Sequence, residues 1–343
     1  MRAFLVTSPR ESAVVDVAPP VAGPGQVVVD VERVGVCGTD VEFFTGEMAY
    51  LTTGQESFPV RLGHEWCGTV SAVGEGVDPG LVGRRTTGDT MLGCQQCDRC
   101  RSGVQHLCAD RYEIGIRHGW PGALAEQLPV PAWALHLLPD SVDDVAGAMV
   151  EPGGNALRAV RAAALSPGDR LLVLGPGTIG LLTALFAVAV GAEVHVLGLP
   201  GRMLDFAGTL GLAGAWTRED LPDLPWHAVV DASGSAELPA LALELVQPGR
   251  RVVYIGLPVA ASPVDARQLT LKDVTAVGIL SASPGLAGAV EHYADGRVDP
   301  RPLVGATVGL DQVAGVLSGE VSPPVGRGPK IQVDPRLLSG QTR

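Results

Sequence analysis

The stretch Leu171-Leu-Val-Leu-Gly-Pro-Gly-Thr-Ile-Gly180 decides the fold of this 343-residue chain. Four apolar residues predict a short buried strand, and the glycine pattern that follows predicts a tight turn opening a helix. Glycines in that context let the pyrophosphate of a dinucleotide approach the backbone, with the helix N-terminus facing the phosphates. We therefore predict dinucleotide contacts at Gly175, Gly177, Thr178, Ile179 and Gly180. The alternative interpretation is a strand–turn–helix junction that binds no nucleotide.

From about Pro167 onward, short apolar strands alternate with helical segments. The strands are expected at Leu171–Leu174, Glu193–Leu197, Ala228–Asp231, Arg251–Ile255 and Thr275–Ile279. Such alternation predicts a doubly wound parallel sheet with helices on both faces, which is an α/β Rossmann domain. We place this domain at residues 151–285.

The rest of the chain has a different pattern. Residues 1–150 contain short β-rich segments such as Gln26–Glu32 and Trp66–Val73, separated by glycine and proline turns. That pattern predicts an irregular, mostly antiparallel, barrel-like domain. Gly305–Val308 and Lys330–Val333 are expected to be strands that return to it, so residues 286–343 would complete this first domain.

Charge and hydropathy exclude several kinds of partner. The formal net charge is -12 and no basic patch is evident, so nucleic acid and anionic membrane surfaces would repel the chain. The uncharged run from Leu171 to Ala192 is interrupted at Gly175-Pro-Gly177, and a helix over Thr178–Val190 would span only about 20 Å at about 1.5 Å per residue. That length falls short of a bilayer core of about 30 Å. With no apolar signal segment at the N-terminus, we expect a cytoplasmic protein.

Four of the six cysteines are closely spaced, as Cys94-x2-Cys97-x2-Cys100-x7-Cys108. Four thiolates in one short loop suit a structural tetrahedral zinc ion. The alternatives are a disulfide-bonded loop, which a cytosolic location disfavours, and an iron–sulfur site, which a count of four thiolates does not exclude. Cys67 is expected to be a core residue.

A second set of metal-ligating side chains lies outside this quartet. It consists of Cys37, His64, Glu65 and Glu151. Three such ligands leave an open position on a zinc ion, where a substrate oxygen can bind and have the pKa of its hydroxyl lowered. Taken singly, each residue has a structural explanation, for example Glu151 as a helix-capping carboxylate. The combination predicts a catalytic zinc site.

These motifs resemble those of the medium-chain zinc alcohol dehydrogenase superfamily over nearly the whole chain. The resemblance rests on Gly35-x-Cys-Gly-Thr-Asp40, Gly63-His-Glu65, the cysteine quartet and the glycine motif, in that order. It is nearer to the sorbitol, threonine and glucose dehydrogenase branches, because the ethanol-oxidising branch has cysteine where this chain has Glu151. It implies a GroES-like catalytic domain and two zinc ions. It also implies Cys37 and His64 as ligands, with Glu65 and Glu151 sharing the remaining role.

Two further residues near Cys37 are candidates for proton transfer. The Thr39 hydroxyl could take the substrate proton, although Thr39 could also be a simple turn residue. Relatives often have histidine at position 42, whereas sugar-oxidising ones often have glutamate. Glu42 is therefore a candidate proton acceptor or sugar-hydroxyl partner, and a merely solvated glutamate is an equal alternative.

The sequence gives a mixed indication of cofactor preference. NAD-preferring sites usually carry an acidic residue about 20 residues beyond the glycine motif, and here Gly198 occupies that place. Arg202 follows closely enough to meet a 2′-phosphate, which favours NADP, although Arg202 could instead begin a solvated helix in an NAD enzyme. Asp231 ends a strand beside the expected cofactor cleft, or it only fixes the following turn.

These observations together predict a zinc-dependent dehydrogenase that reversibly oxidises a secondary hydroxyl of a polyol, sugar, cyclitol or similar small molecule with NAD(P). A redox-neutral epimerase that retains its cofactor is the first alternative. A non-catalytic nucleotide-binding sensor is the second, and it would have no need for Cys37 and His64. The resemblance also implies a homodimer or homotetramer formed through the dinucleotide-binding domains.

Overall fold

The computed structural model describes residues 1–337. These residues form two compact units: unit 1 comprises residues 1–151, 304–324 and the chain from Lys330 onward, and unit 2 comprises 152–303 and 325–329. We expected the chain to return to the first domain at residue 286, but residues 286–303 belong to unit 2 and the return begins at Val304. Helix α10 (Leu286–Ala294) explains the difference, since Gly288 lies against Leu157 and the Tyr293 ring stacks on Phe186.

Unit 1 is built on a mostly antiparallel sheet. Its strand order is β16-β17-β3-β4-β5-β9, and β8 also pairs with β3. β17 pairs with β3 through Gln332 opposite Gly35, so the C-terminal strand completes the N-terminal sheet. The strands span Gln26–Gly35 (β3), Glu65–Val73 (β4), Arg85–Gly88 (β5), Gln127–Pro131 (β8), Leu135–Leu137 (β9), Val304–Val308 (β16) and Lys330–Val333 (β17).

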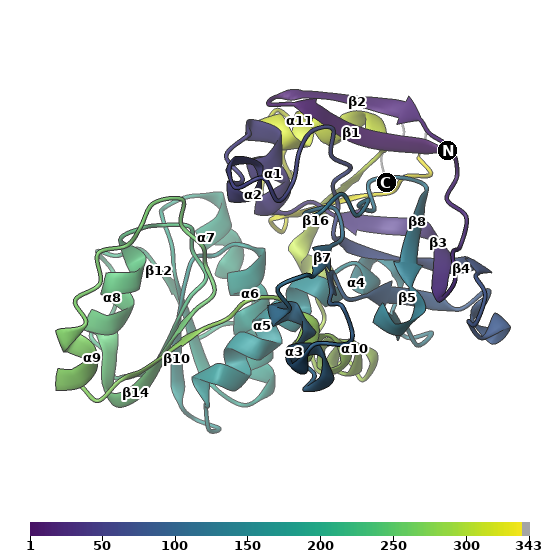
Figure 1. Ribbon diagram of the computed structural model, residues 1–343. Coiled ribbons are helices and arrows are strands. Elements are labelled where there is room, and N and C mark those ends of the chain that lie inside the picture. Colours follow the sequence, from purple (N-terminus) through teal and green to yellow (C-terminus); the bar gives the residue numbers. More distant parts are fainter. Residues whose placement is uncertain (338–343) are drawn as a thin grey trace. The chain divides into compact units, whose positions relative to one another are not determined.

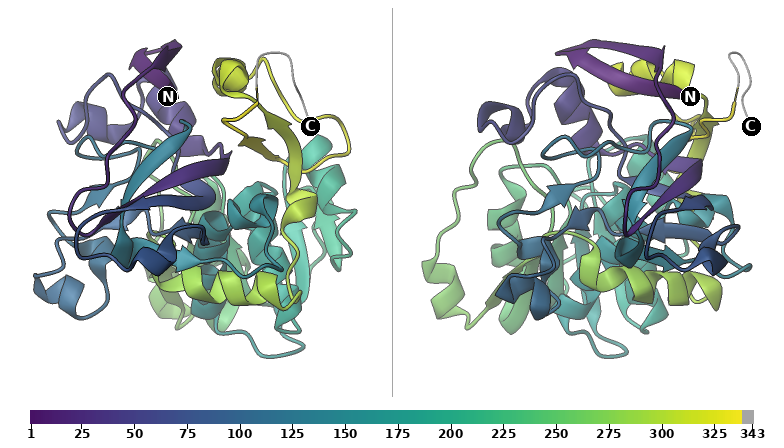
Figure 2. Two further views of the ribbon diagram at one scale, coloured as in Figure 1. Left: turned by 90° about the vertical axis from the view of Figure 1, so that its right-hand side faces the viewer. Right: turned by 45° about the vertical axis from the view of Figure 1, so that its right-hand side comes forward.

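Two small sheets and several short helices surround this sheet. The small sheets are β1-β2 (Arg2–Ser8, Glu11–Asp16) and β6-β7 (Met91–Leu92, Tyr112–Glu113). The helices are α1 (Gly38–Thr45), α2 (Ala49–Thr52), α3 (Asp98–Arg101), α4 (Asp144–Gly147) and α11 (Val313–Ser318), and α5 (Val150–Ala163) begins at the unit boundary. Figures 1 and 2 show α11 beside the β1-β2 pair, where Arg2 binds Asp311 at 2.7 Å.

A buried ion-pair network helps to hold the returning C-terminal segment in unit 1. Arg33 on β3 is 5% exposed and donates a 2.5 Å hydrogen bond to Asp334, which directly follows β17. Arg336 also binds Asp334, at 2.8 Å, and Arg33 lies 3.3 Å from Asp144. Each buried charge thereby has an opposite charge nearby, as burial of ionised groups requires.

Unit 2 has the predicted parallel sheet. Its strand order is β12-β11-β10-β13-β14-β15, and every neighbouring pair is parallel. The five predicted strands are present, and β12 is a sixth strand that sequence analysis missed, because its three residues are too few to show a period. The strands are Arg170–Leu174 (β10), Glu193–Leu197 (β11), Gly214–Trp216 (β12), Trp226–Asp231 (β13), Val246–Tyr254 (β14) and Thr275–Gly278 (β15).

Helices cover both faces of this sheet (Figure 1). Leu172 and Leu174 on β10 contribute to a core that includes Ala242 and Leu243 of α8. Successive strand residues point to opposite faces, so Leu171 and Val173 face the other layer. The unit 2 helices are α5 from Pro152 onward, α6 (Thr178–Ala189), α7 (Arg202–Ala207), α8 (Leu238–Leu245), α9 (Arg267–Leu271) and α10.

Helix α6 ends one residue before its expected end, which confirms that the uncharged run is a strand and a core helix. Within residues 1–337, no helix combines the length and apolar character needed to cross a membrane.

Candidate metal centres and dinucleotide-binding motif

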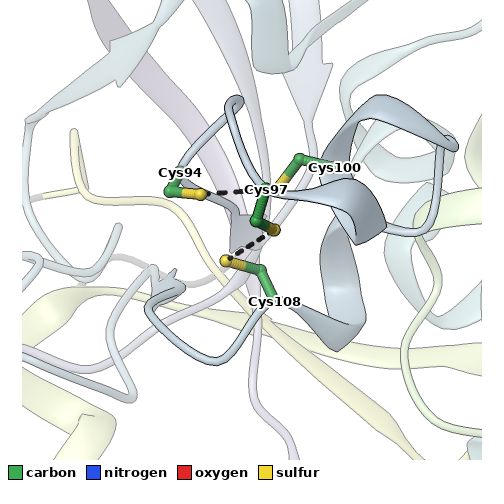
Figure 3. A group of neighbouring side chains, drawn as sticks. All are labelled: Cys94, Cys97, Cys100 and Cys108. Atoms are coloured by element: carbon green, nitrogen blue, oxygen red, sulfur yellow. Dashed lines mark hydrogen bonds between the residues drawn. The ribbon is translucent and has the colours of Figure 1, made fainter.

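The four cysteines of the quartet converge on one point (Figure 3). Their sulfur atoms all lie within 4.8 Å of one another, with 3.9 Å between Cys94 and Cys100 and 3.8 Å between Cys97 and Cys108. A tetrahedron with zinc–sulfur bonds of about 2.3 Å has edges of roughly 3.8 Å. All four thiols are free, and these separations are far longer than a disulfide bond of about 2.05 Å. The donor set therefore fits a tetrahedral zinc ion.

Local backbone structure prepares the quartet for a metal. Cys97 precedes α3 and Cys108 follows a short 3₁₀ turn, so two small helical turns present the sulfurs. Backbone N–H groups of Gln96 and Cys97 lower the pKa of Cys94 to about 7, which favours the thiolate that metals bind. A Cβ at Gly93 would lie 2.7 Å from the Cys100 sulfur, so the loop needs glycine at that position.

The structure brings together three of the four residues of the second set. Ligand atoms of Cys37, His64 and Glu65 all lie within 4.8 Å of one another. Cys37 follows β3, and His64 and Glu65 stand at the start of β4, where Glu65 is paired with Gly35. A Cβ at Gly35 would lie 2.0 Å from Glu65 Oε2, so only glycine leaves room for this carboxylate. One thiolate, one imidazole and one carboxylate are donors that suit zinc.

Glu151 is outside this group of three. It is the second residue of α5 and lies in the first turn of that helix. Among residues 1–337, the metal-ligating atoms that lie within 4.8 Å of one another at this site are those of Cys37, His64 and Glu65.

Asp40 supports both Cys37 and His64, and sequence analysis did not assign it a role. Its side chain is fully buried and accepts a 2.9 Å hydrogen bond from the Cys37 N–H and a 3.3 Å bond from the Gly63 N–H. Its Oδ1 lies 3.6 Å from His64 Nδ1. A carboxylate beside one ring nitrogen orients the imidazole and leaves the other nitrogen for a metal. Burial opposes the charged imidazole, but Asp40 and Cys37 raise the pKa of His64 well above its ordinary value.

Lys330 is a second residue that sequence analysis missed. Its Nζ binds both oxygens of Glu65, at 2.8 and 2.6 Å, and the Val36 carbonyl at 2.9 Å. Both charged side chains are at most 3% exposed. Burial opposes the charged form of Lys330, but Glu65, Cys37 and Asp40 together raise its pKa, so the ammonium persists. A lysine 265 positions away in the sequence thus balances the charge of this carboxylate.

Thr39 and Glu42 both lie on α1, one turn apart, and both are half-buried. Residues three apart on a helix are neighbours on its surface. Burial, with a smaller contribution from Glu47, raises the pKa of Glu42. A carboxyl group with a raised pKa accepts a proton more readily, and Glu42 is therefore not a fully solvated glutamate.

The glycine motif has the predicted strand–turn–helix structure. Gly175 has φ +101°, and a Cβ on Gly180 would lie 1.9 Å from the Gly175 carbonyl oxygen, so both positions need glycine. A Cβ on Gly177 would meet nothing within 4 Å, which leaves open space before the first residue of α6. Thr178 and Ile179 form the first turn of this helix. Open space at a helix N-terminus suits the phosphates of a dinucleotide.

The residues assigned to the adenosine end of the dinucleotide follow or end a strand, or begin the next helix. Gly198 directly follows β11, and a Cβ there would lie 2.7 Å from the Pro176 ring. Pro176 therefore explains why no acidic side chain stands at this position. Arg202 is the first residue of α7 and is exposed. Asp231 ends β13, and its Oδ1 accepts hydrogen bonds from Ser233 N at 3.0 Å and Oγ at 2.6 Å, so its carboxylate fixes the following turn.

Two family models match the chain. Residues 23–140 match the alcohol dehydrogenase GroES-like domain, and residues 178–294 match the zinc-binding dehydrogenase family. The first match contains Cys37, His64, Glu65 and the cysteine quartet, and the second begins at Thr178, within the glycine motif.

Characterised relatives align with most of the chain. A 2-dehydro-3-deoxy-L-galactonate 5-dehydrogenase from Pseudoalteromonas atlantica is 31% identical over 88% of this chain and 90% of its own. An L-galactonate-5-dehydrogenase from Escherichia coli is 30% identical over 83% and 84%. An L-threonine 3-dehydrogenase from Idiomarina loihiensis is 31% identical over 77% and 79%.

Solved structures also align with almost the whole chain. A zinc-binding dehydrogenase from Sinorhizobium meliloti bound to NADP aligns with a TM-score of 0.88 and 26% identity, over 97% of this chain and 99% of its own. An alcohol dehydrogenase from Thermus sp. ATN1 aligns with a TM-score of 0.86 and 26% identity, over the same shares.

Proposed function

The chain belongs to the zinc-dependent medium-chain alcohol dehydrogenase superfamily, and on that premise we propose which residues perform its chemistry. It is an NAD(P)-linked oxidoreductase of secondary alcohols. We assign the Cys37–His64–Glu65 group as its catalytic metal centre. The observation that carries this assignment is the convergence of three metal donors outside the cysteine quartet. A protein that used zinc only as a structural staple would need the quartet alone.

The chain's own residues have distinct roles in this proposal. Zinc held by these residues would supply a Lewis acid that lowers the pKa of a substrate hydroxyl, and a bound NAD(P) would supply the hydride acceptor. Asp40 orients the His64 ring through its Nδ1. Lys330 binds both oxygens of the Glu65 carboxylate, which keeps a buried charge balanced. The Thr39 hydroxyl would accept the substrate proton while donating its own proton onward, and Glu42 would accept that proton and release it to solvent, a role that its raised pKa supports.

Glu151 has a less direct role in this proposal. A carboxylate at the first turn of α5 stabilises the helix N-terminus. The family resemblance makes Glu151 a candidate ligand for the state in which Glu65 remains with Lys330. We therefore propose Glu65 as the direct ligand and Glu151 as the alternative one.

We propose that the enzyme accepts NADP. Gly198 leaves no carboxylate to repel a 2′-phosphate, and Arg202 follows at the start of α7. The Sinorhizobium meliloti structure bound to NADP supports this assignment.

We also propose a cytoplasmic homo-oligomer. β15 is an edge strand whose residues are mostly exposed, and unpaired edges readily pair with another chain. Leu257, Val259 and Leu271 in the same unit are each more than 80% exposed. Edge pairing between two copies would cover part of this apolar surface. A monomeric mass by light scattering would contradict the proposal.

Absorbance at 340 nm tests the proposed function directly. The zinc-loaded protein is incubated with NAD or NADP and a panel of polyols, sugars and sugar acids, with His64→Ala as the control. The proposal expects cofactor reduction that disappears in the variant. Scrambled substrate stereochemistry without cofactor reduction would instead show an epimerase.

A further inference from the structure

A cavity of about 360 Å³ lies in unit 1, and we call it the Arg61 cavity. Segments that are far apart in the sequence line it, from Leu5 on β1 to Pro129 on β8. Among residues 1–337, its lining includes none of the proposed metal ligands, nor Thr39 or Glu42. Ligand pockets in proteins usually measure roughly 300–1,000 Å³, so this cavity is large enough for a small molecule.

Most of the residues that line the cavity are apolar, among them Leu5 and Val17. The Trp120 indole is fixed in this lining, because its Nε1 donates a 3.1 Å hydrogen bond to the Pro129 carbonyl. Trp120 also lines an adjoining cavity of about 340 Å³, where the Tyr112 ring meets it edge-on with ring centres 5.8 Å apart. Walls of this kind bury the hydrocarbon part of a ligand.

Arg61 brings a positive charge into this lining without a partner for it. The side chain is partly buried, and its buried Nε makes no hydrogen bond within residues 1–337. Burial lowers the pKa of the guanidinium group to about 10, and no charged group of the described residues offsets that shift. A group with this pKa remains protonated at neutral pH. An anion that bound here would recover the free energy lost by burying an unpaired charge.

The other charged groups of the lining are already engaged by the backbone. Glu56 Oε1 accepts a 2.9 Å hydrogen bond from the Ser57 N–H, and its Oε2 accepts a 2.8 Å bond from the Gly119 N–H. The Met1 amino group donates to the Val17 carbonyl at 2.8 Å. Glu56 therefore leaves Arg61 unpaired, and its charge would repel a ligand that carries more than one negative charge.

Backbone hydrogen bonds hold the Arg61 segment on both sides. Val60 and Val6 exchange two bonds of 2.9 Å, and the Gly122 N–H donates to the Arg61 carbonyl at 2.8 Å. The cavity is thus built on paired backbone rather than on a free loop. A preformed site loses less conformational entropy when a ligand binds.

We propose that the Arg61 cavity binds a small monocarboxylate with an apolar body. Arg61 binds the carboxylate, and Trp120 contacts the apolar part. Arginine suits this task because its planar fork matches a carboxylate. A phosphate ester fits less well, because it carries a charge of about -1.5 to -2 and Glu56 also lines the cavity. The site is separate from the proposed metal centre, so this inference goes beyond the proposed function.

The test is calorimetric titration of the zinc-loaded protein with three probes. These are 4-phenylbutyrate, its neutral amide 4-phenylbutyramide, and the dianion phenyl phosphate. The wild type should bind the carboxylate about tenfold or more tightly than the amide, because a hydrogen bond to a charged group is lost in the amide. Arg61→Met should abolish this difference and leave amide binding nearly unchanged. Arg61→Lys should recover part of it.

Two control variants separate this site from other cationic groups. Arg84→Gln removes an exposed positive charge from unit 1 outside the cavity, and it should bind phenylbutyrate like the wild type. A carboxylate can also bind a catalytic zinc ion, which His64→Ala should remove. Phenylbutyrate affinity should be the same in His64→Ala as in the wild type. Affinity that falls in His64→Ala but not in Arg61→Met would place the ligand at the metal centre and overturn the proposal.

Thermal unfolding distinguishes a binding role for Arg61 from a structural one. Without ligand, Arg61→Met should unfold at a higher temperature than the wild type, because an unpaired buried charge has been removed. Phenylbutyrate should raise the unfolding temperature of the wild type and not that of the variant. Three results would overturn the proposal: a less stable Arg61→Met variant with no phenylbutyrate binding in the wild type, equal affinity for the acid and the amide, or tighter binding of phenyl phosphate.

Discussion

The two metal-ligating groups of unit 1 differ in how the chain builds them. The quartet takes all four ligands from residues 94–108, and three of these cysteines are only half-buried. The Cys37–His64–Glu65 group takes its ligands from the ends of two paired strands, and two of the three are buried. Asp40 and Lys330 support its ligands from α1 and β17. Local spacing can thus specify a structural site, whereas a reactive site needs charges that only the fold brings together.

The largest expected effect separates the two groups by function. His64→Ala should lower kcat/KM by about a thousandfold or more, because a catalytic metal supplies several kcal/mol of transition-state stabilisation. Bound zinc should fall from two ions per chain toward one, while the quartet keeps its ion. Kinetics and elemental analysis on the same preparation measure both quantities. Full activity would show that His64 is not part of the catalytic site. Loss of both ions together would show that the two groups do not bind metal independently.

The next effect concerns the buried Lys330–Glu65 ion pair, which has no counterpart at the quartet. In the metal-free protein, Lys330→Met should reduce the free energy of unfolding by about 3–5 kcal/mol, because Glu65 would remain buried without its counter-charge. Adding Glu65→Gln to that variant should restore part of the loss. Denaturant unfolding of both single variants and the double variant provides the test. If the two losses simply add, the ion pair does not couple these residues.

A smaller effect is expected from the residue that orients His64. Asp40→Asn should weaken zinc binding at the second group by about 10–100-fold, as loss of a supporting carboxylate commonly does. Competition with a zinc-binding dye measures the affinity of each site. Asp16→Asn, a change on the exposed surface of β2, is the control. Equal weakening at the quartet would argue against a specific role for Asp40.

The smallest effect concerns thiol reactivity in the metal-free protein. With a pKa of about 7, the Cys94 thiol should be about half ionised at pH 7, whereas an ordinary thiol near 8.5 is only a few per cent ionised. Its alkylation should therefore rise with pH around a midpoint near 7 and level off above it. Burial raises the pKa of Cys67, which should stay unmodified. Peptide mass spectrometry after timed iodoacetamide treatment identifies which cysteine reacts first.

The same contrast explains what the sequence could predict. The quartet, the glycine motif and five strands of the parallel sheet depend on short spacings, and the structure has all of them as expected. Cys37, His64 and Glu65 were identified, together with Glu151, as a combination of residue types, and the structure groups the first three. Lys330 was not, because a lysine in a strand gives no local sign that it will meet Glu65.

Packing decided the features that the sequence did not predict. Residues 286–303 belong to unit 2 because α10 packs on α5 and α6, a contact that helix periodicity cannot assign to a partner. The Arg61 cavity was also missed, because the segments that line it are far apart in the sequence. Only the fold shows that, within residues 1–337, the buried Nε of Arg61 makes no hydrogen bond.

Anomalous diffraction at the zinc edge from crystals of the purified, zinc-loaded protein tests the central claim most directly. The account predicts two peaks per chain, one surrounded by the four quartet sulfurs and one beside Cys37, His64 and Glu65. A single peak at the quartet in fully loaded, active protein would contradict it.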